Sequence, residues 1–180
     1  MLFKSSKRNK KILENTFDSI EKRLSKLDFE LAKEYLNWLE RKTVYLESSV
    51  NKKSYLNQPK NLKPGDIVWV EFGINVGTEL SDYKTKGHYA LVINVSLGNV
   101  VVIPLSRSES VNSLYIDLGI IDELSDGDKK FHSILKVDAI RSVSKRRIGK
   151  IKGVKEGKVT LDKDLFEEVK IKIEDVLFDK

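Results

Sequence analysis

Three apolar segments of strand length stand in the middle of the sequence, at residues 67–72, 89–95 and 100–105. They are rich in Val and Ile and are bounded by Gly, Asn and Ser, which is the pattern of strands that are largely buried. The polar residues 73–87, which include three glycines, separate the first two segments. Long polar loops on small domains commonly bind a ligand or move. The pattern predicts a compact β-barrel with one long functional loop.

Further strands and a closing helix are predicted downstream. Residues 113–118 alternate as a strand, 120–131 have the glycine and acidic residues of a loop, and 133–143 supply one or two more strands. Apolar residues recur at near-helical spacing in the last segment, 162–178: Leu165, Val169, Ile173 and Val176. This spacing predicts a C-terminal helix that closes the barrel.

The N-terminal part of the chain has a helical period instead. Apolar residues at helical spacing run through residues 10–47: Ile12, Leu13, Phe17, Ile20, Leu24, Leu27, Leu31, Tyr35, Trp38 and Leu39. Asp28 interrupts them as an N-cap, so the segment is a helical hairpin or one long bent helix. Tyr35 and Trp38 lie on the apolar stripe and are expected to pack rather than to stack on nucleobases. Residues 48–62 lack periodicity and are predicted to be a linker that ends at Pro64.

The predicted fold class is therefore α+β, mainly β. A helical, basic extension with its linker occupies residues 1–58, and a small barrel domain with a C-terminal helix occupies 59–180. The 180 residues contain no cysteine and only two histidines, which excludes disulfides and thiolate or histidine-rich metal sites. Catalysis, if present, is expected to be independent of metal. No apolar run approaches the roughly 20 residues that span a bilayer, so we expect a cytoplasmic protein.

The net charge of +6 is unevenly distributed. Residues 1–62 contain 14 Lys and Arg against 8 Asp and Glu, whereas residues 63–180 contain 19 of each kind. Within the second part, residues 141–158 contain eight Lys and Arg against Glu156 alone. This basic segment is either a solvated face or a surface that contacts phosphates, and composition does not separate the two.

Four short motifs carry a family resemblance: Gly65-Asp66-Ile67, Gly77-Thr78-Glu79, Ala90-Leu91-Val92-Ile93 and Ile103-Pro104-Leu105-Ser106. Together with residues 133–143, they resemble the MazF/PemK family of type II toxin–antitoxin systems over about residues 63–180. The resemblance implies an SH3-like, MazF-like barrel and a homodimer that needs no cofactor. It implies an mRNA interferase, which is an endoribonuclease that cleaves single-stranded RNA at short sequences through attack of the ribose 2′-hydroxyl. The product is a 2′,3′-cyclic phosphate, and a cognate antitoxin protein neutralises the activity.

The resemblance also points to catalytic positions. The family commonly has an arginine two residues before the Ala-Leu-Val-Ile run and a threonine after the Pro-hydrophobic pair, where this chain has His88 and Ser106. Ser106 keeps a hydroxyl that can donate to a phosphate oxygen. His88 is suited to proton transfer near neutral pH, but it lacks a permanent charge and could instead weaken catalysis or merely cap the barrel mouth.

Lys136 and Asp138 match an arginine and an aspartate that some PemK-type relatives use for RNA cleavage. Two residues apart on a predicted strand, they would share one face, where they would act on RNA or form an exposed ion pair. The residues expected to contact RNA lie in the loop and around the strands: Thr78, Glu79, Tyr83, Lys84, Lys86, Arg107 and Arg141. No role is assigned to His132.

Two alternatives stay open at this point. The same barrel could be a non-catalytic RNA-binding protein, or a topoisomerase inhibitor of the CcdB type, although residues 175–180 do not clearly copy the C-terminal hydrophobic pair of such inhibitors. The basic extension either widens the contact with RNA or packs on the barrel where antitoxins bind shorter relatives.

Overall fold

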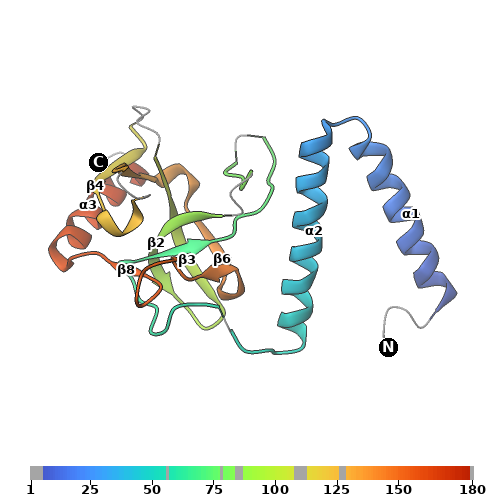
Figure 1. The fold of residues 1–180 in the computed structure, drawn as a ribbon, viewed down its shortest axis with the longest axis horizontal. Helices are drawn as coiled ribbons and strands as arrows, with labels where there is room; N and C mark the ends of the chain where they lie inside the picture. Colours follow the sequence, from blue (N-terminus) through green and yellow to red (C-terminus); the bar gives the residue numbers. More distant parts are fainter. Residues whose placement is uncertain are drawn as a thin grey trace. The chain divides into compact units, whose positions relative to one another are not determined.

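The computed structural model describes residues 6–55, 57–77, 79–83, 87–107, 113–125 and 129–178. The chain forms two compact units, Met1–Thr43 and Val44–Lys180. The order of the elements is shown in Figure 1. None of the helices in the described part of the chain has the length and apolar character needed to cross a membrane.

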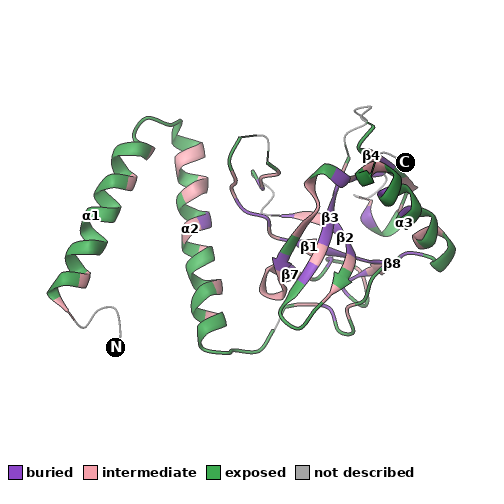
Figure 2. Cartoon of the chain, turned by 180° about the vertical axis from the view of Figure 1, so that it is seen from behind, coloured by how far each residue is buried: buried purple, intermediate pink, exposed green. Residues whose placement is uncertain are grey.

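The N-terminal segment forms two helices, α1 (Lys7–Leu24) and α2 (Phe29–Val50). Asp28 accepts hydrogen bonds from the backbone N–H groups of Glu30 (2.9 Å) and Leu31 (3.3 Å), which confirms it as the N-cap of α2. Ser6 caps α1 in the same way. The segment therefore forms two separate helices and not one long bent helix. No residue of α1 is buried, as the exposed colouring of this helix in Figure 2 shows, and Trp38 is the buried residue of α2.

The described residues of the second unit contain eight strands and one long helix. These elements are β1 (Asp66–Val70), β2 (His88–Val95), β3 (Asn99–Ser106), β4 (Tyr115–Ile120), β5 (His132–Lys136), β6 (Arg141–Ser144), β7 (Ile148–Gly149), β8 (Val159–Thr160) and α3 (Lys163–Phe178). All the pairings are antiparallel, in the order β4-β5-β3-β2-β1-β7, with β6 also on β3 and β8 also on β1. The predicted α+β class, with an antiparallel sheet and terminal helices, is confirmed.

The sheet curls because a very short connection joins β6 and β7, which pair with strands on opposite sides of β2. β6 pairs with β3, whereas β7 pairs with β1 on the far side of β2. Only the 3₁₀ turn Lys145–Arg147 separates β6 from β7. The sheet must therefore wrap around until β6 and β7 are close, which gives the barrel that the apolar pattern predicts.

The strands are apolar on both faces because each face contacts a core. One cluster contains Val68, Val70, Phe72, Val92, Val102, Val143 and Ile148, among others. The other contains Ile67, Leu91, Ile103 and Leu135 together with Val169 and Ile173 of α3. Successive residues of β1 thus enter different clusters, which explains a continuous apolar run instead of an alternating one. The predicted C-terminal helix is confirmed, and it covers the second cluster.

The Gly65-Asp66 motif organises the start of the barrel. Gly65 has φ +88°, and a Cβ there would lie 3.4 Å from the ring of Phe166, so a side chain would be strained. The fully buried carboxylate of Asp66 accepts hydrogen bonds from the Lys63 amide (2.8 Å), the Thr160 hydroxyl (2.7 Å) and the Lys158 ammonium (2.9 Å). Asp66 thereby ties the linker, β1 and β8 together.

Candidate active site

The candidate site lies where three neighbouring strands begin or end. β2 begins at His88, β3 ends at Ser106 and β5 begins at His132. β3 lies between the other two, since it pairs with β2 at Ala90 and Pro104 and with β5 at Ser106. Antiparallel pairing thus brings three residues that are distant in the sequence to one end of the sheet.

A cavity of about 350 Å³ opens among these strand ends. Its polar lining comes from His88, Ser106, Arg107, His132 and Ser133. Apolar and aromatic residues complete it: Trp69, Tyr89, Leu105, Leu124 and Phe131. Ligand sites are typically concave, largely apolar and equipped with a few convergent polar groups, and this cavity has that composition.

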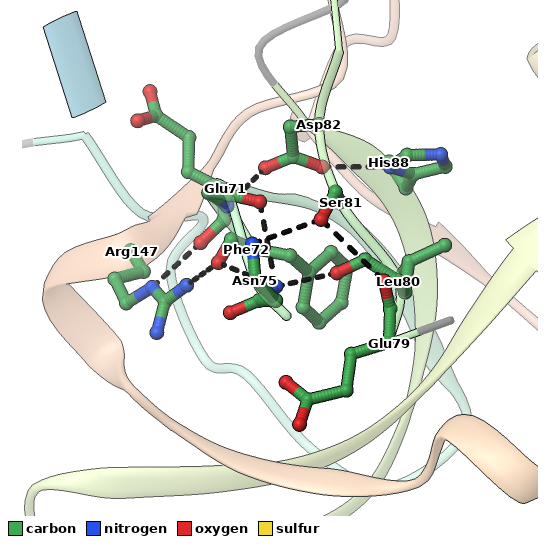
Figure 3. Close-up of polar contacts among 10 residues, drawn as sticks. Glu71, Phe72, Asn75, Glu79, Leu80, Ser81, Asp82, His88 and Arg147 are labelled. Carbon is green, nitrogen blue, oxygen red and sulfur yellow. Dashed lines mark hydrogen bonds and ion pairs between the residues drawn. The ribbon is translucent and has the colours of Figure 1, made fainter. Parts of the chain in front are cut away.

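The buried carboxylate of Asp82 orients the imidazole of His88 through a contact with Nδ1. The side chain of Asp82 is 1% exposed, and its Oδ1 lies 2.7 Å from Nδ1 of His88 (Figure 3). Its Oδ2 accepts a hydrogen bond from the Gly73 amide at 2.5 Å. An ionised carboxylate can only accept, so Nδ1 of His88 carries the hydrogen and Nε2 is the nitrogen that can exchange a proton with a ligand.

The loop that carries Asp82 is folded on itself by local polar contacts. The Asp82 amide donates to the Gly73 carbonyl (3.0 Å), and the Asn75 amide donates to the Ser81 hydroxyl (2.8 Å). The side-chain amide of Asn75 donates to the Leu80 carbonyl at 2.5 Å, as Figure 3 shows. These bonds satisfy backbone groups that would otherwise need water, and they fix the position of the carboxylate.

Arg147 supports the start of the same loop. Its guanidinium donates to the carbonyl oxygens of Glu71 (2.6 Å) and Phe72. Burial lowers the pKa of Arg147, and the negative charge of Asp82 acts in the opposite direction. An arginine stays protonated in proteins, so this cation balances the buried carboxylate that orients His88.

A second histidine on the cavity has the same kind of partner. Nδ1 of His132 lies 2.7 Å from Oδ2 of Asp117, which is on the adjacent strand β4. Oδ1 of Asp117 accepts from the Gly119 amide at 2.7 Å. Partial desolvation raises the pKa of Asp117, but the bond from Gly119, the bond and charge of His132, and the charge of Lys172 outweigh it, so the net pKa lies below the usual value. Asp117 is therefore ionised at neutral pH.

Four of the seven residues predicted to contact RNA lie in the described part of the chain. Arg107 lines the cavity and lies over the ring of Phe131, with its guanidinium carbon 4.5 Å from the centroid. Arg141 begins β6 and lies over Phe72, 5.4 Å from the ring centroid. Glu79 and Tyr83 are exposed residues of the loop. The remaining predicted contacts, Thr78, Lys84 and Lys86, lie outside the described residues.

Lys136 and Asp138 do not lie on one strand, so the prediction that they share a strand face is wrong. β5 ends at Lys136, and the chain then forms the 3₁₀ turn Val137–Ala139, so alternation along a strand does not relate the two side chains. The Lys136 ammonium lies 5.3 Å from the centroid of the Tyr115 ring, and Asp138 is exposed. The cavity lining includes His88 and Ser106 but neither of these residues. Their catalytic role stays a prediction.

Much of the basic segment 141–158 has internal partners. Arg146 donates to the Ser48 hydroxyl and to the Lys53 carbonyl, each at 2.7 Å, and Arg147 holds the loop as described. Lys158, whose side chain is 6% exposed, pairs with Asp66. These three side chains therefore contact protein groups, and the choice between a solvated face and a phosphate-contacting surface stays open for the other cations of the segment.

Sequence reasoning missed two features, the Asp82–His88 pair and the place of His132. The only signal available was that the chain has just two histidines, each at the start of an apolar segment. The described residues contain no group of three or more His, Cys, Asp or Glu placed to hold a metal ion.

The fold and the cavity define a small antiparallel barrel with a histidine-lined site at the strand ends. Residues 63–177 match the family model described as "PemK-like, MazF-like toxin of type II toxin-antitoxin system". The match spans more than half of the chain, and the chain belongs to this family. The predicted MazF/PemK membership is confirmed. No curated protein matches the sequence.

Two solved structures resemble the chain at low identity. One is an endoribonuclease in complex with its cognate antitoxin from a mycobacterial species, with 12% identity and a TM-score of 0.45, and the match covers 64% of this chain and 94% of that one. The other is an endoribonuclease from a mycobacterial species, with 10% identity and a TM-score of 0.42, covering 69% and 95% of the two chains.

Proposed function

We propose that this chain is a toxin endoribonuclease that cuts single-stranded RNA at selected short sequences without a metal ion. The observation that carries the proposal is the Asp82–His88 pair, which borders the cavity that Ser106 also lines. Both residues lie within the segment that matches the family model, and by the resemblance described above they stand where the family commonly has an arginine and a threonine. A toxin of a type II system has a cognate antitoxin protein, and we propose that it blocks this site.

The reaction we propose is transesterification within the RNA. His88 Nε2 takes the proton from a ribose 2′-hydroxyl, the 2′-oxygen forms a bond to the adjacent phosphorus, and the bond from phosphorus to the 5′-oxygen breaks. The products are a 2′,3′-cyclic phosphate and a 5′-hydroxyl. DNA lacks the attacking hydroxyl, so the chemistry itself selects RNA. Asp82 stabilises the imidazolium that forms, because opposite charges attract strongly where water is excluded.

The reaction also requires groups that stabilise the negative charge on the reacting phosphate. The Ser106 hydroxyl is proposed to donate to a non-bridging phosphate oxygen, and the Arg107 guanidinium supplies a permanent positive charge beside it. Lys136 ends β5 and Asp138 lies in the turn after it, both outside the cavity lining, so contributions from them would come from beyond the residues assigned here. A homodimer, as the family resemblance implies, is part of the proposal.

The test is cleavage of a long unstructured RNA by the purified full chain in EDTA, followed by analysis of the fragment ends. His88→Ala and Ser106→Ala are compared with Ser142→Ala, which removes an exposed hydroxyl on β6. We expect cuts at selected sequences with 2′,3′-cyclic phosphate ends for the wild type and Ser142→Ala, and a loss of about 10²-fold or more in the two site variants. Intact RNA from a folded, antitoxin-free wild type would contradict the proposal and favour a binding protein.

A further inference from the structure

The chemistry proposed above needs an acid as well as a base. The departing 5′-oxygen is a poor leaving group unless it receives a proton in the transition state. Among the described residues that line the cavity, only His88 and His132 are of the residue type suited to proton transfer near neutral pH. Arg107 does not release its proton, and the Tyr89 phenol belongs to a class that ionises near pH 10.

We propose that His132 is the general acid of this site, oriented by Asp117, so that two aspartate-held histidines share the proton transfers. The inference rests on the proposed ribonuclease function and adds to it a catalytic residue and a positioning residue. His132 lines the same cavity as His88 and Ser106, and in each histidine Nδ1 lies 2.7 Å from an aspartate oxygen. Nε2 is therefore the nitrogen available for proton transfer in both rings.

The position of Asp117 depends on an irregularity in β4. The register with β5 shifts between Asp117 and Ile120, and Gly119 there has φ +75°. This bulge lets the Gly119 amide donate to one oxygen of Asp117 while the other faces His132. Bulges commonly re-aim side chains beside active sites. The glycine is required because a residue with a Cβ would be strained at this φ.

The different burial of the Asp82–His88 and Asp117–His132 pairs indicates which histidine is the base and which is the acid. Asp82 is buried with the Arg147 cation nearby, whereas the side chains of His132 and Asp117 are 47% and 49% exposed. The buried Asp82 best stabilises a positive charge that appears on His88 during the reaction, because its field is least screened. In its role as the acid, His132 must begin protonated, and its exposed position lets water stabilise that charge. The charged groups around it are Asp117 on β4, Arg107 after β3, and Lys172 of α3, which acts through Asp117.

The proton balance closes with no further reactant. His88 accepts the 2′-hydroxyl proton as the bond from the 2′-oxygen to phosphorus forms. His132 donates its Nε2 proton to the 5′-oxygen as the bond from phosphorus to that oxygen breaks. One imidazole gains a proton and the other loses one, and exchange with water restores both.

The decisive experiment compares two leaving groups. Full-length wild type, His132→Ala and His88→Ala are assayed on one short RNA and on the same RNA with sulfur in place of the scissile 5′-oxygen. A thiolate leaves without protonation, because thiols are far more acidic than alcohols. We expect His132→Ala to be about 10²–10⁴-fold slower than wild type on the oxygen substrate and near wild type on the sulfur substrate. His88→Ala should be slow on both.

Controls and pH profiles separate this role from a structural one. Lys130→Ala removes an exposed ion pair with Asp122 near β5 and should cut both substrates normally. The wild-type rate on the oxygen substrate should be bell-shaped with pH, and His132→Ala should lose the high-pH limb. In Asp117→Asn that limb should move to lower pH, because the imidazolium loses a negatively charged partner. We expect the rate to fall about 10-fold, similar to the 10- to 100-fold effect of removing groups that orient metal-binding histidines.

The outcomes distinguish the two proposals. Failure of the wild type to cut the oxygen substrate would overturn the proposed function. If the wild type cuts RNA, a second outcome concerns His132 alone. A folded His132→Ala whose rate relative to wild type is the same on both substrates would overturn the acid role of His132 and leave the ribonuclease proposal standing.

Discussion

The Asp82 carboxylate accepts two hydrogen bonds that serve different ends. The bond to the Gly73 amide closes the loop, and the bond to Nδ1 of His88 sets the orientation and tautomer of the imidazole. A single buried side chain thus couples loop conformation to the group proposed to take the 2′-hydroxyl proton.

Asp82→Asn separates these two effects at the scale of one residue. The asparagine has one accepting oxygen. When that oxygen stays on the Gly73 amide, the NH₂ group faces Nδ1 of His88, so the charged hydrogen bond is lost and the imidazole must take the other tautomer. We expect a loss of about 1–3 kcal/mol in the free energy of unfolding. We also expect kcat for RNA cleavage to fall about 10–100-fold while KM changes little. Asp175→Asn, an exposed change on α3, is the matched control. Full activity of Asp82→Asn would contradict the orienting role.

Sequence motifs placed His88 and Ser106, because each is next to a local pattern that survives without structural context. They did not place Asp82 opposite His88 or Asp117 opposite His132. The second pair depends on strand register and a bulge, since 15 positions separate its members. Such contacts depend on tertiary structure, which cannot be deduced from the period of the apolar pattern or from composition.

At the scale of elements, the strands of the barrel were predictable where both faces are buried, because continuous apolar runs mark them. Residues 133–143 were harder, since the same apolar pattern covers β5, a 3₁₀ turn and β6. Lys158 shows that a count of charges along the sequence does not predict which cations are buried. Its local sequence is that of a solvated basic segment, yet β8 brings it against the buried carboxylate of Asp66.

Lys158→Ala tests whether this pair holds β1 and β8 together. Removing the ammonium leaves Asp66 buried with fewer partners, and breaking one side of a buried ion pair costs about 3–5 kcal/mol. Urea unfolding of Lys158→Ala should therefore show a large loss of stability. Lys155→Ala, at an exposed position in the same basic segment, should stay within about 0.5 kcal/mol of wild type. Equal stabilities of the two variants would mean that the Asp66–Lys158 pair is not a structural connection.

At the scale of the whole molecule, the excess positive charge belongs to the N-terminal part, while the unit with the cavity is close to neutral. In that unit, the Arg146, Arg147 and Lys158 side chains contact protein groups. Other cations of the basic segment, Lys150, Lys152 and Lys155, are exposed in that unit. The exposed cations at the start of α1, which include Lys10 and Lys11, are the densest group available.

We therefore expect the extension to strengthen RNA binding through charge. The comparison uses His88→Ala throughout, so that RNA is bound without being cut, and adds Lys7→Gln, Lys10→Gln and Lys11→Gln together. Each lost phosphate contact should flatten the dependence of log Kd on log salt concentration by about 0.7 for single strands. Lys163→Gln with Lys170→Gln, on exposed positions of α3, is the control and should leave the slope unchanged. Identical slopes for the α1 variant and its parent would exclude phosphate contacts by these lysines. The alternative in which the extension packs on the barrel would then be favoured, because that role does not depend on ionic strength in the same way.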